Sequence, residues 1–590
     1  MKTYTGIPAS PGIAVGTAFV YHGDTIEIPR YSIKKNKVDA ELQRLETAIA
    51  QTASEINALC EKAAGEISSE QAEIFQTHLL MLEDTDFQDI LQDRLKKNLH
   101  NIEWVVWEVS CEFSQKLMLS SDLDLRERAV DITDVARRVI NNLLANTKSS
   151  SFLADLDKDV ILVSRNLMPS EVLAMNKSRV KGIALDEGSK NSHTAILAKA
   201  FEIPAVLGLS IISKEIKDGE TITLNGTSGI ATVNPDKRTL TRCGNEEKQQ
   251  REQTAALAAL RDVPAETTDG YRVTLKANIG FPEEAESALR FGAEGVGLYR
   301  SEFLFLVSDQ SADEEIQYKA YSHVLKTMGT LPVTIRTVDL GGDKIGDKIG
   351  DKIMAGIQTE SEKNPLLGQR AIRLSLANPK HFKVQLRAIL RAGVHGNAKI
   401  MFPMISGIEE LEQAVSLLEE ARVECKKKKL PIAEKIDAGV MIEIPSAAMT
   451  ADILAEKSNF FSIGSNDLIQ YSLAADRNDE KVSYLAESYH PAVLRFLKRI
   501  IDAAHEKGIK AGMCGELAGD VSATALLLGL GLDEFSMTAS FIPQIKQVIR
   551  GTNMESCKAL ADECLKGKSI SEVRSLIQAW TAANTKHKKR

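Results

Sequence analysis

Several side chains able to bind anions or metal ions stand just after apolar segments in the second half of the chain. They are Arg300 after GVGLY, Arg336 in TIRTVD, Lys344 after DLGGD, Arg370 in NPLLGQR, Glu443 after GVMI, Asn466 and Asp467 after FSIGS, Arg477 ten residues further on, and Cys514 after AGM. Arginine binds carboxylate and phosphate groups through paired N–H hydrogen-bond donors. Several guanidiniums in one place therefore predict a binding site for a compact polyanion. For any single member of this set, an ordinary ion pair is the alternative interpretation.

Two carboxylates and one thiol of this set predict more specific chemistry. Glu443 and Asp467 suit Mg²⁺, because this ion takes one or two protein carboxylates and leaves its other positions to water and substrate phosphate. Cys514 lies in the glycine-rich sequence GMCGE. It is either a small buried hydrophobe or an acid, base or nucleophile of the site.

These side chains need a scaffold that brings distant parts of the sequence together. Apolar segments ending in polar or glycine residues recur between helical stretches, as RVTLKANIG, GVGLYRSEF, PVTIRTVDLGGDK, KIMFPMIS, AGVMIEIPS, FFSIGSND, KAGMCGE and DEFSMTA. Near-continuous apolar strands that alternate with helices are typical of a parallel sheet, and this many βα units in one run predict a (β/α)₈ barrel. Since the chemistry of such barrels lies at the C-terminal ends of the strands, we expect the whole set around one mouth.

In the first half, His193 is the candidate for covalent chemistry. It stands in EGSKNSHTAILAKA, where a turn leads through Ser192 into a predicted helix. A histidine at a helix N-terminus, close to unsatisfied backbone N–H groups, is well placed to hold a transferred phosphoryl group. Its neutral imidazole, with a reference pKa of about 6.5, is a nucleophile at neutral pH. A capped histidine with a purely structural role is the alternative.

The rest of the first half predicts an α/β domain interrupted by helices. A strand–turn–strand pattern opens the chain in GIPASPGIAVGTAFVY, and the β texture returns in VILVS. Between them, apolar residues step by three and four positions from Leu42 onward, which predicts a helical bundle. The charged, Ala-rich residues 236–262 are predicted to form a helical linker.

An acidic window lies inside the helical block. Between Glu66 and Asp93 the chain has acidic residues but no Lys or Arg, and Phe75, His78 and Leu79 lie within this window at helical spacing. The window is either a solvated acidic face beside a core stripe or a docking surface for a small basic partner that is steered by charge.

Composition excludes several classes of protein. The net charge of −8 (73 − 81) argues against a nucleic-acid binder, and 43% hydrophobic with 26% charged residues excludes wholesale disorder. The 7 cysteines are scattered and contain no Cys-x-x-Cys pair, which argues against a disulfide framework or structural zinc and favours a reducing compartment. Because no stretch of about 18 apolar residues occurs, we expect no membrane insertion and a cytoplasmic protein.

Whole motifs of the chain resemble Enzyme I of the bacterial sugar phosphotransferase system. These motifs are GIPASPGIAVG, HTAILAKA, IPAVLG, GAEGVGLYRSEFLF, RTVDLGGDK, NPLLGQRAIR, MFPMIS, FFSIGSNDLIQYSLAADRN, HPAVLR, GMCGELAGD and LGLDEFSM. The resemblance covers essentially the whole chain. It implies transfer of the phosphoryl group of phosphoenolpyruvate (PEP) to the enzyme and then to a histidine of the carrier protein HPr, as the first step of sugar uptake.

The resemblance also implies a multidomain α/β architecture. Residues 1–23 and 145–235 would form a swivelling phosphohistidine α/β domain, into which residues 24–144 insert an all-α HPr-binding domain. A (β/α)₈ barrel, residues 263–590, would follow the linker, bind PEP and Mg²⁺, and form a homodimer.

Individual roles follow from the matching positions. The resemblance implies that His193 carries the phosphoryl group, that Glu443 and Asp467 bind Mg²⁺, and that Cys514 protonates the enolate. It implies that the PEP-binding groups are Arg300, Arg336, Asn466 and Arg477, with Arg370 and Lys344 beside the phosphate. HPr would dock near Phe75, His78 and Leu79.

The chain departs from the family pattern near the active histidine and in one loop. Ser189, Lys190 and Asn191 replace family residues before the His motif, and Met168 stands where the family usually has a threonine. The tetrapeptide GDKI occurs three times in Gly342–Ile353, so Lys348 and Lys352 are alternatives to Lys344.

Two alternatives follow from these departures and from the shared barrel. A weakened paralogue that acts as a regulatory scaffold fits the changes around His193. A dikinase or PEP synthase would need a nucleotide-grasping domain, which the residues before His193 do not offer.

Overall fold

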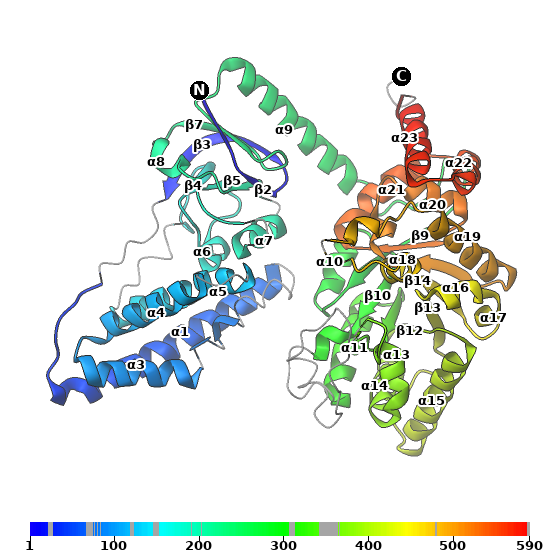
Figure 1. Cartoon of the computed structure of the whole chain (residues 1–590), viewed down its shortest axis with the longest axis horizontal. Helices are drawn as coiled ribbons and strands as arrows, with labels where there is room; N and C mark the ends of the chain where they lie inside the picture. The colour runs from blue at the N-terminus through cyan, green and yellow to red at the C-terminus, as the bar shows by residue number, and fades with distance from the viewer. Residues whose placement is uncertain are drawn as a thin grey trace. The chain divides into compact units, whose positions relative to one another are not determined.

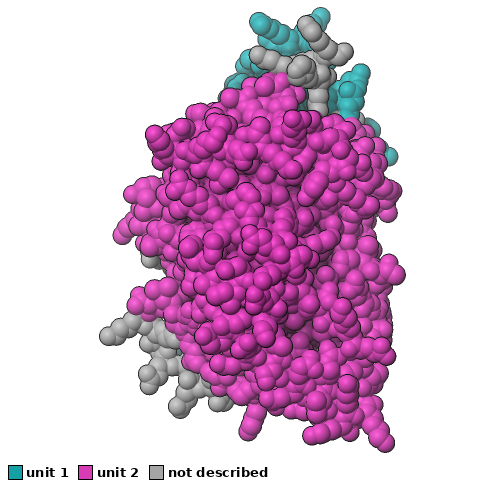
Figure 2. Space-filling model, turned by 90° about the vertical axis from the view of Figure 1, so that its right-hand side faces the viewer, with its two compact units in different colours: residues 1–254 teal, residues 255–590 magenta. Residues whose placement is uncertain are grey.

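The two halves of the chain form separate units in the computed structural model, Met1–Thr254 and Ala255–Arg590 (Figures 1 and 2). The structure describes residues 1–21, 28–66, 75, 77–79, 81–82, 84–118, 123–144, 153–189, 192–201, 203–305, 313–340, 364, 366–477, 479 and 481–586. The border between the units falls within the charged helix α9 (Lys237–Ala258).

An eight-stranded sheet organises the first unit, in the order β1-β8-β7-β3-β4-β5-β6-β2. Its strands are β1 (Lys2–Thr5), β2 (Ile7–Ser10), β3 (Ile13–Tyr21), β4 (Val160–Ser164), β5 (Val180–Leu185), β6 (Ala205–Leu207), β7 (Thr221–Asn225) and β8 (Ile230–Val233). The strands from β3 to β6 run parallel to one another. Short helices lie between the strands: α6 (Pro169–Ala174), α7 (His193–Ala200) and α8 (Ile212–Glu215).

A helical bundle is inserted between the neighbouring parallel strands β3 and β4 (Figure 1). Its helices are α1 (Val38–Glu66), α3 (Thr85–Asn98), α4 (Ile102–Met118) and α5 (Leu123–Leu143). The predicted stripe of α1 faces the core of this bundle, because Leu45, Thr52 and Ile56 are buried. Burying such a stripe stabilises helices that would be marginal alone.

A closed barrel of eight parallel strands forms the second unit. The strands are β9 (Thr274–Ile279), β10 (Val296–Arg300), β11 (Pro332–Arg336), β12 (Asn397–Phe402), β13 (Asp437–Ile442), β14 (Phe460–Ile463), β15 (Lys510–Met513) and β16 (Glu534–Met537). Each corresponds to one of the apolar segments from which the barrel was predicted. The predicted fold class, a multidomain α/β protein with an inserted helical domain and a C-terminal barrel, is confirmed.

Helices alternate with the strands and surround the barrel (Figure 1). They are α10 (Glu284–Arg290), α11 (Glu314–Met328), α13 (Ala371–Ala377), α14 (Pro379–Ala392), α15 (Ile408–Lys427), α16 (Pro445–Met449), α17 (Ala451–Ala455), α18 (Ser465–Leu473), α19 (Pro491–Glu506), α20 (Thr524–Leu530) and α21 (Ile542–Arg550). The chain continues into α22 (Met554–Lys566) and α23 (Ile570–Lys586). None of the described helices combines the length and apolar character needed to cross a membrane.

Candidate functional site

The C-terminal ends of the barrel strands bring most of the candidate residues together. Arg300 ends β10 and Arg336 ends β11, and these two residues are paired across the two strands. Arg370 also follows β11 and stands just before α13. The remaining residues follow other strands: Glu443 after β13, Asn466 and Asp467 in the first turn of α18, Arg477 beyond that helix, and Cys514 after β15. Lys344 and the whole GDKI repeat lie outside the described residues.

Two arginines of this mouth are buried and share one carboxylate. The side chain of Arg336 donates to Glu302, and its Nη1 lies 3.0 Å from Asp339 Oδ2. Arg370, which is fully buried, places Nη2 3.1 Å from Asp339 Oδ1 and 3.4 Å from Asp467 Oδ2. The mouth is therefore a network in which carboxylates hold guanidiniums in fixed places, as expected for buried charges.

Burial and charge act in opposite directions on these arginines. Burial lowers the pKa of Arg336, but the carboxylates of Glu302 and Asp339 outweigh it and leave the pKa above its ordinary value. The pKa of Arg370 is also raised, because Asp339 and Asp467 outweigh its burial. Both side chains therefore stay cationic at every physiological pH.

The other polar candidates lie nearer to solvent. Arg300 is exposed at the end of β10, and Arg477 is part-buried with Nη1 3.6 Å from Asp467 Oδ1. Asn466 exchanges hydrogen bonds with Glu516: its Nδ2 donates to Oε1 at 3.2 Å, and its Oδ1 accepts from the Glu516 backbone N–H at 3.0 Å. The mouth thus offers exposed as well as buried groups to an anion.

Glu443 and Asp467 fit a Mg²⁺ site with two protein carboxylates. Both are buried after neighbouring strands, and a Cβ on Gly464 would lie 2.6 Å from Glu443 Oε2, so only glycine leaves room for this carboxylate. Glu443 Oε1 accepts from the backbone N–H of Met404 at 2.6 Å, and Met404 has the left-handed φ of 56°. Such strain in a non-glycine residue is typical of functional sites.

No larger protein-only metal site competes with this pair. Within the part of the chain that the structure describes, no group of three or more His, Cys, Asp or Glu side chains gathers in a metal-binding arrangement. Mg²⁺ is commonly bound by one or two protein carboxylates, and its remaining coordination positions are filled by water and substrate phosphate.

Cys514 is a buried thiol at the base of the mouth. It packs with Leu298, Met401, Met441 and Phe460 inside the barrel. Burial raises the pKa of the Cys514 thiol, although a hydrogen bond with Ser462 and the charge of Arg336 act in the other direction. The sulfur is therefore protonated at neutral pH, which is the form that an acid catalyst needs.

His193 begins helix α7 in the first unit. Ser192 caps this helix: its Oγ accepts from the backbone N–H of Ala195 at 3.3 Å and donates to the Ser189 carbonyl at 3.0 Å. Thr194 Oγ1 donates to the Leu167 carbonyl at 2.8 Å, which ties the start of α7 to the segment before α6. The helix start is thus held in place by hydroxyls on both sides of the histidine.

Met168, which stands where the resemblance implies a threonine, precedes α6 directly. The carboxylate of Glu171 accepts from the Met168 backbone N–H at 2.8 Å and from the Tyr21 hydroxyl at 2.8 Å. Burial raises the pKa of Glu171. The start of α6 is therefore capped by the carboxylate of Glu171, although Met168 offers no side-chain hydroxyl. Lys190 and Asn191 lie outside the described residues.

Two of the three residues expected near a docking surface lie inside the helical bundle. Phe75 and His78 are fully buried with their rings in edge contact at 5.6 Å, and His78 Nε2 lies 3.3 Å from Asp131. Leu79 is only part-buried. Phe75 and His78 are therefore core residues, and of these three residues only Leu79 is accessible to a partner.

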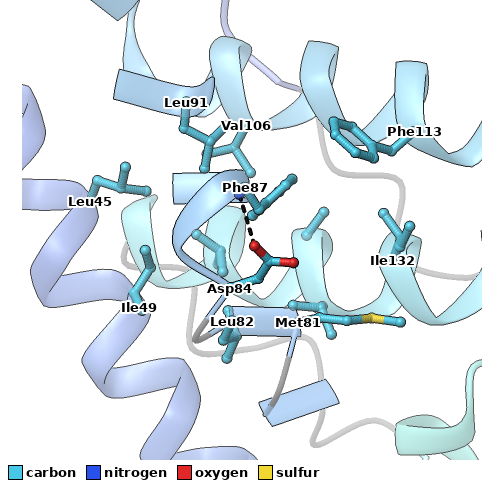
Figure 3. Close-up of a pocket in the computed structure, with 13 residues that line it drawn as sticks. Leu45, Ile49, Met81, Leu82, Asp84, Phe87, Leu91, Val106, Phe113 and Ile132 are labelled. Atoms are coloured by element: carbon cyan, nitrogen blue, oxygen red, sulfur yellow. Dashed lines mark hydrogen bonds between the residues drawn. The ribbon is translucent and has the colours of Figure 1, made fainter. Parts of the chain in front are cut away.

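An apolar pocket in the helical bundle is lined in part by Met81 and Leu82, which follow Leu79 in the sequence (Figure 3). Its volume is ≈ 110 Å³. The described lining comes from α1, α3, α4, α5 and the segment before α3: Leu45, Ile49, Met81, Leu82, Asp84, Phe87, Leu91, Val106, Phe113, Ile132, Val135, Ala136 and Val139. Among the described residues that line it, Asp84 is the one with a charged side chain, and it caps the start of α3 by accepting from the Phe87 backbone N–H at 3.2 Å.

Comparisons with known proteins point to one enzyme family. Models of PEP-utilising enzymes match residues 5–128 (N-terminal), 156–229 (mobile domain) and 254–554 (PEP-binding domain). The phosphoenolpyruvate-protein phosphotransferase of Staphylococcus carnosus is 38% identical over 580 residues, which cover 98% of this chain and 99% of that protein. Those of Priestia megaterium and Haemophilus influenzae are 39% identical over 578 and 584 residues, with the same coverage. The chain belongs to the phosphoenolpyruvate-protein phosphotransferase family.

Membership of the phosphoenolpyruvate-protein phosphotransferase family confirms the resemblance predicted from the motifs and makes this chain an enzyme. The sequence reasoning missed Glu302, Asp339 and Tyr471, whose hydroxyl accepts from Arg370 at 3.1 Å. Glu302 lies two residues after the end of β10 and Asp339 three residues after the end of β11, so the strand-end position that singled out Arg336 could have found them too.

Proposed function

We propose that this enzyme transfers the phosphoryl group of PEP to His193 and then to a histidine of the carrier protein HPr, which starts the sugar phosphotransferase system. The observation that carries the proposal is the barrel mouth, which holds the buried cations Arg336 and Arg370 and a buried thiol, Cys514, on which the charge of Arg336 acts. Such a mouth binds a small polyanion and can protonate a product formed there.

Phosphoryl transfer from PEP needs positive charge and an acid. We assign PEP binding to Arg300, Arg336, Asn466 and Arg477, with Arg370 and Lys344 beside the phosphate. A ring nitrogen of His193 attacks the phosphorus, so that an N–P bond forms and the P–O bond to the enol oxygen breaks. When bound by Glu443 and Asp467, Mg²⁺ supplies further neutralisation of the phosphoryl oxygens.

The enolate left by this step is protonated at its methylene carbon. We assign the proton to the Cys514 thiol, which gives pyruvate and a thiolate that recovers a proton from water. The carrier's histidine then attacks the phosphorus on His193: one N–P bond breaks and another forms. In this proposal the imidazole of His193 accepts the phosphoryl group at the barrel and donates it to a carrier that is bound to the helical bundle. The α/β domain that carries His193 must therefore reorient between the two steps.

Labelled PEP tests this function. The full chain is incubated with [³²P]PEP and Mg²⁺, and acid-labile, base-stable label is mapped to its residue. We expect label on His193 that moves to added HPr. Label that requires ATP would favour a dikinase, and no label at all would favour a scaffold without activity.

The carrier is expected to dock on the helical domain beside the apolar pocket. The acidic residue Asp84 lines the pocket (Figure 3), and the part-buried Leu79 lies two residues before the lining residue Met81 in the sequence. This segment therefore offers an apolar contact together with negative charge to a basic partner. We propose that HPr contacts Leu79 while Phe75 and His78 support the surface from the core.

Leu79→Asp tests this docking site. We expect KM for HPr to rise about tenfold, since removing one apolar anchor of an interface costs at least about 1 kcal/mol, while labelling of His193 by PEP stays unchanged. Val423→Asp on the exposed surface of α15 is the matched control and should change neither value. Equal KM values for HPr in the two variants would contradict the assignment.

We further propose that two chains associate through their barrels and that the enzyme works in the cytoplasm, where its scattered cysteines remain reduced. Sedimentation of the full chain at micromolar concentration should give twice the chain mass of 64.6 kDa. The isolated first unit, Met1–Thr254, should sediment as a monomer. A monomeric full chain would refute the association.

A further inference from the structure

One carboxylate links the two buried arginines of the barrel mouth. Asp339 is fully buried, and its two oxygens divide between two cations: Oδ2 lies 3.0 Å from Arg336 Nη1, and Oδ1 lies 3.1 Å from Arg370 Nη2. Two guanidiniums would repel each other in a buried place without such a bridge. The bridge therefore sets how far apart the two cations stand.

The segment that carries Asp339 is itself fixed at several points. The Thr337 backbone N–H donates to the Met401 carbonyl at 2.9 Å, and the Val338 backbone N–H donates to the buried Gln385 at 3.0 Å. Gln385 Nε2 in turn donates to Ser301 Oγ at 2.9 Å, and this hydroxyl donates to the Arg336 carbonyl at 2.7 Å. The backbone around Asp339 is thus tied to three neighbouring elements.

A second tie joins the segment to Arg370. Ala371 has the left-handed φ of 51°, and its backbone N–H donates to the Leu340 carbonyl at 3.0 Å. This hydrogen bond holds the residue after Arg370 against the residue after Asp339. A left-handed alanine costs free energy and persists only where the surroundings impose it, which is common at functional sites.

We propose that Asp339 is a positioning residue that holds Arg336 and Arg370 as one preorganised pair, which contacts the phosphoryl group during its transfer. The inference rests on the proposed PEP site but assigns a role to a residue outside it. Asp339 touches the two arginines and acts through them. Preorganised charges are worth most in the transition state, because they need no rearrangement when charge moves.

Removal of the Asp339 carboxylate should lower kcat without raising KM for PEP. In Asp339→Asn the arginines lose their shared anchor, so we expect kcat to fall about 100-fold, the cost of a misplacement of about 1 Å. The variant also leaves one more net positive charge at the mouth, so KM for PEP and the affinity for PEP by calorimetry should stay equal or improve. A role in stability alone would not produce this split.

Two further variants make the test decisive. Asp339→Glu keeps the buried charge and hence the fold, but its longer side chain displaces the carboxylate, so we expect the same loss of kcat. Glu534→Gln removes a part-buried carboxylate of the barrel, the partner of Lys276 at the start of β16, and should lower thermal stability without changing kcat. The inference is overturned if Asp339→Glu retains wild-type kcat, or if Asp339→Asn changes only KM or behaves like Glu534→Gln. A wild-type chain that PEP does not label would overturn the proposed function and this inference together.

Discussion

Replacement of His193 by alanine is expected to abolish both pyruvate release and phosphorylation of HPr. The proposed chemistry routes every phosphoryl group through this ring at the start of α7, and no second nucleophile of the mechanism replaces it. Pyruvate formation from PEP and phosphate transfer to HPr, measured in the same reaction, should both fall to the rate without enzyme. The affinity for PEP by calorimetry should remain, because the barrel forms a separate unit.

A surface histidine provides the matched control for this variant. His381 lies exposed on α14 and belongs to none of the assigned catalytic or binding groups, so His381→Ala should keep both activities. Pyruvate release that continues at the wild-type rate in His193→Ala would contradict the account, because it would mean that PEP is cleaved without this histidine.

The second large effect is expected at Cys514. In Cys514→Ser the acid is a hydroxyl, a far weaker proton donor, in the same buried place. We expect kcat for pyruvate formation to fall by about 10²–10⁴-fold, the usual contribution of an acid catalyst, with little change in KM for PEP. Because phosphoryl transfer and protonation are separate steps, the variant should form pyruvate more slowly than it forms phosphohistidine.

The pH dependence gives an independent check on this thiol. Burial raises the pKa of Cys514, so the protonated form required of an acid persists through the neutral range and is lost only when the pH rises above that raised value. The wild-type rate should therefore hold on the alkaline side to higher pH than an ordinary thiol would allow. Cys425, another buried cysteine whose pKa burial raises, serves as control: Cys425→Ser should retain wild-type kcat. Equal kcat for Cys514→Ser and wild type would refute the assignment.

The barrel was predictable from sequence because its signal repeats. Each strand is a short apolar run followed by glycine or polar residues, and a parallel sheet covered by helices requires this composition. The inserted bundle was predictable for a related reason, since the stripe that includes Leu45 and Ile56 shows the period of a buried helix face.

The pairing of charges inside the mouth was not predictable. Position at a strand end identified Arg336 as a candidate, but its partnership with Glu302 and Asp339 depends on side-chain directions that spacing does not give. Arg370 lies in NPLLGQR, a segment with no strand pattern, and neither its full burial nor its contacts with Asp339 and Asp467 can be read from that segment. Such contacts are tertiary and appear only in the folded chain.

The acidic window shows the same limit in the helical domain. Helical spacing placed Phe75, His78 and Leu79 near one another, but it could not say which face of the helix is buried. The apolar core of the bundle takes Phe75 and His78, and only Leu79 remains partly accessible. A histidine inside an acidic window is therefore no guide to a surface.

The central claim is that His193 carries the phosphoryl group between PEP and the carrier, and a rapid-quench pulse–chase measures this directly. The full chain is mixed with [³²P]PEP and Mg²⁺ for less than one turnover and then chased with unlabelled PEP and excess HPr. The account predicts that label appears first on His193 and then passes to HPr in equal amount. Label that reaches HPr without ever residing on His193 would contradict it.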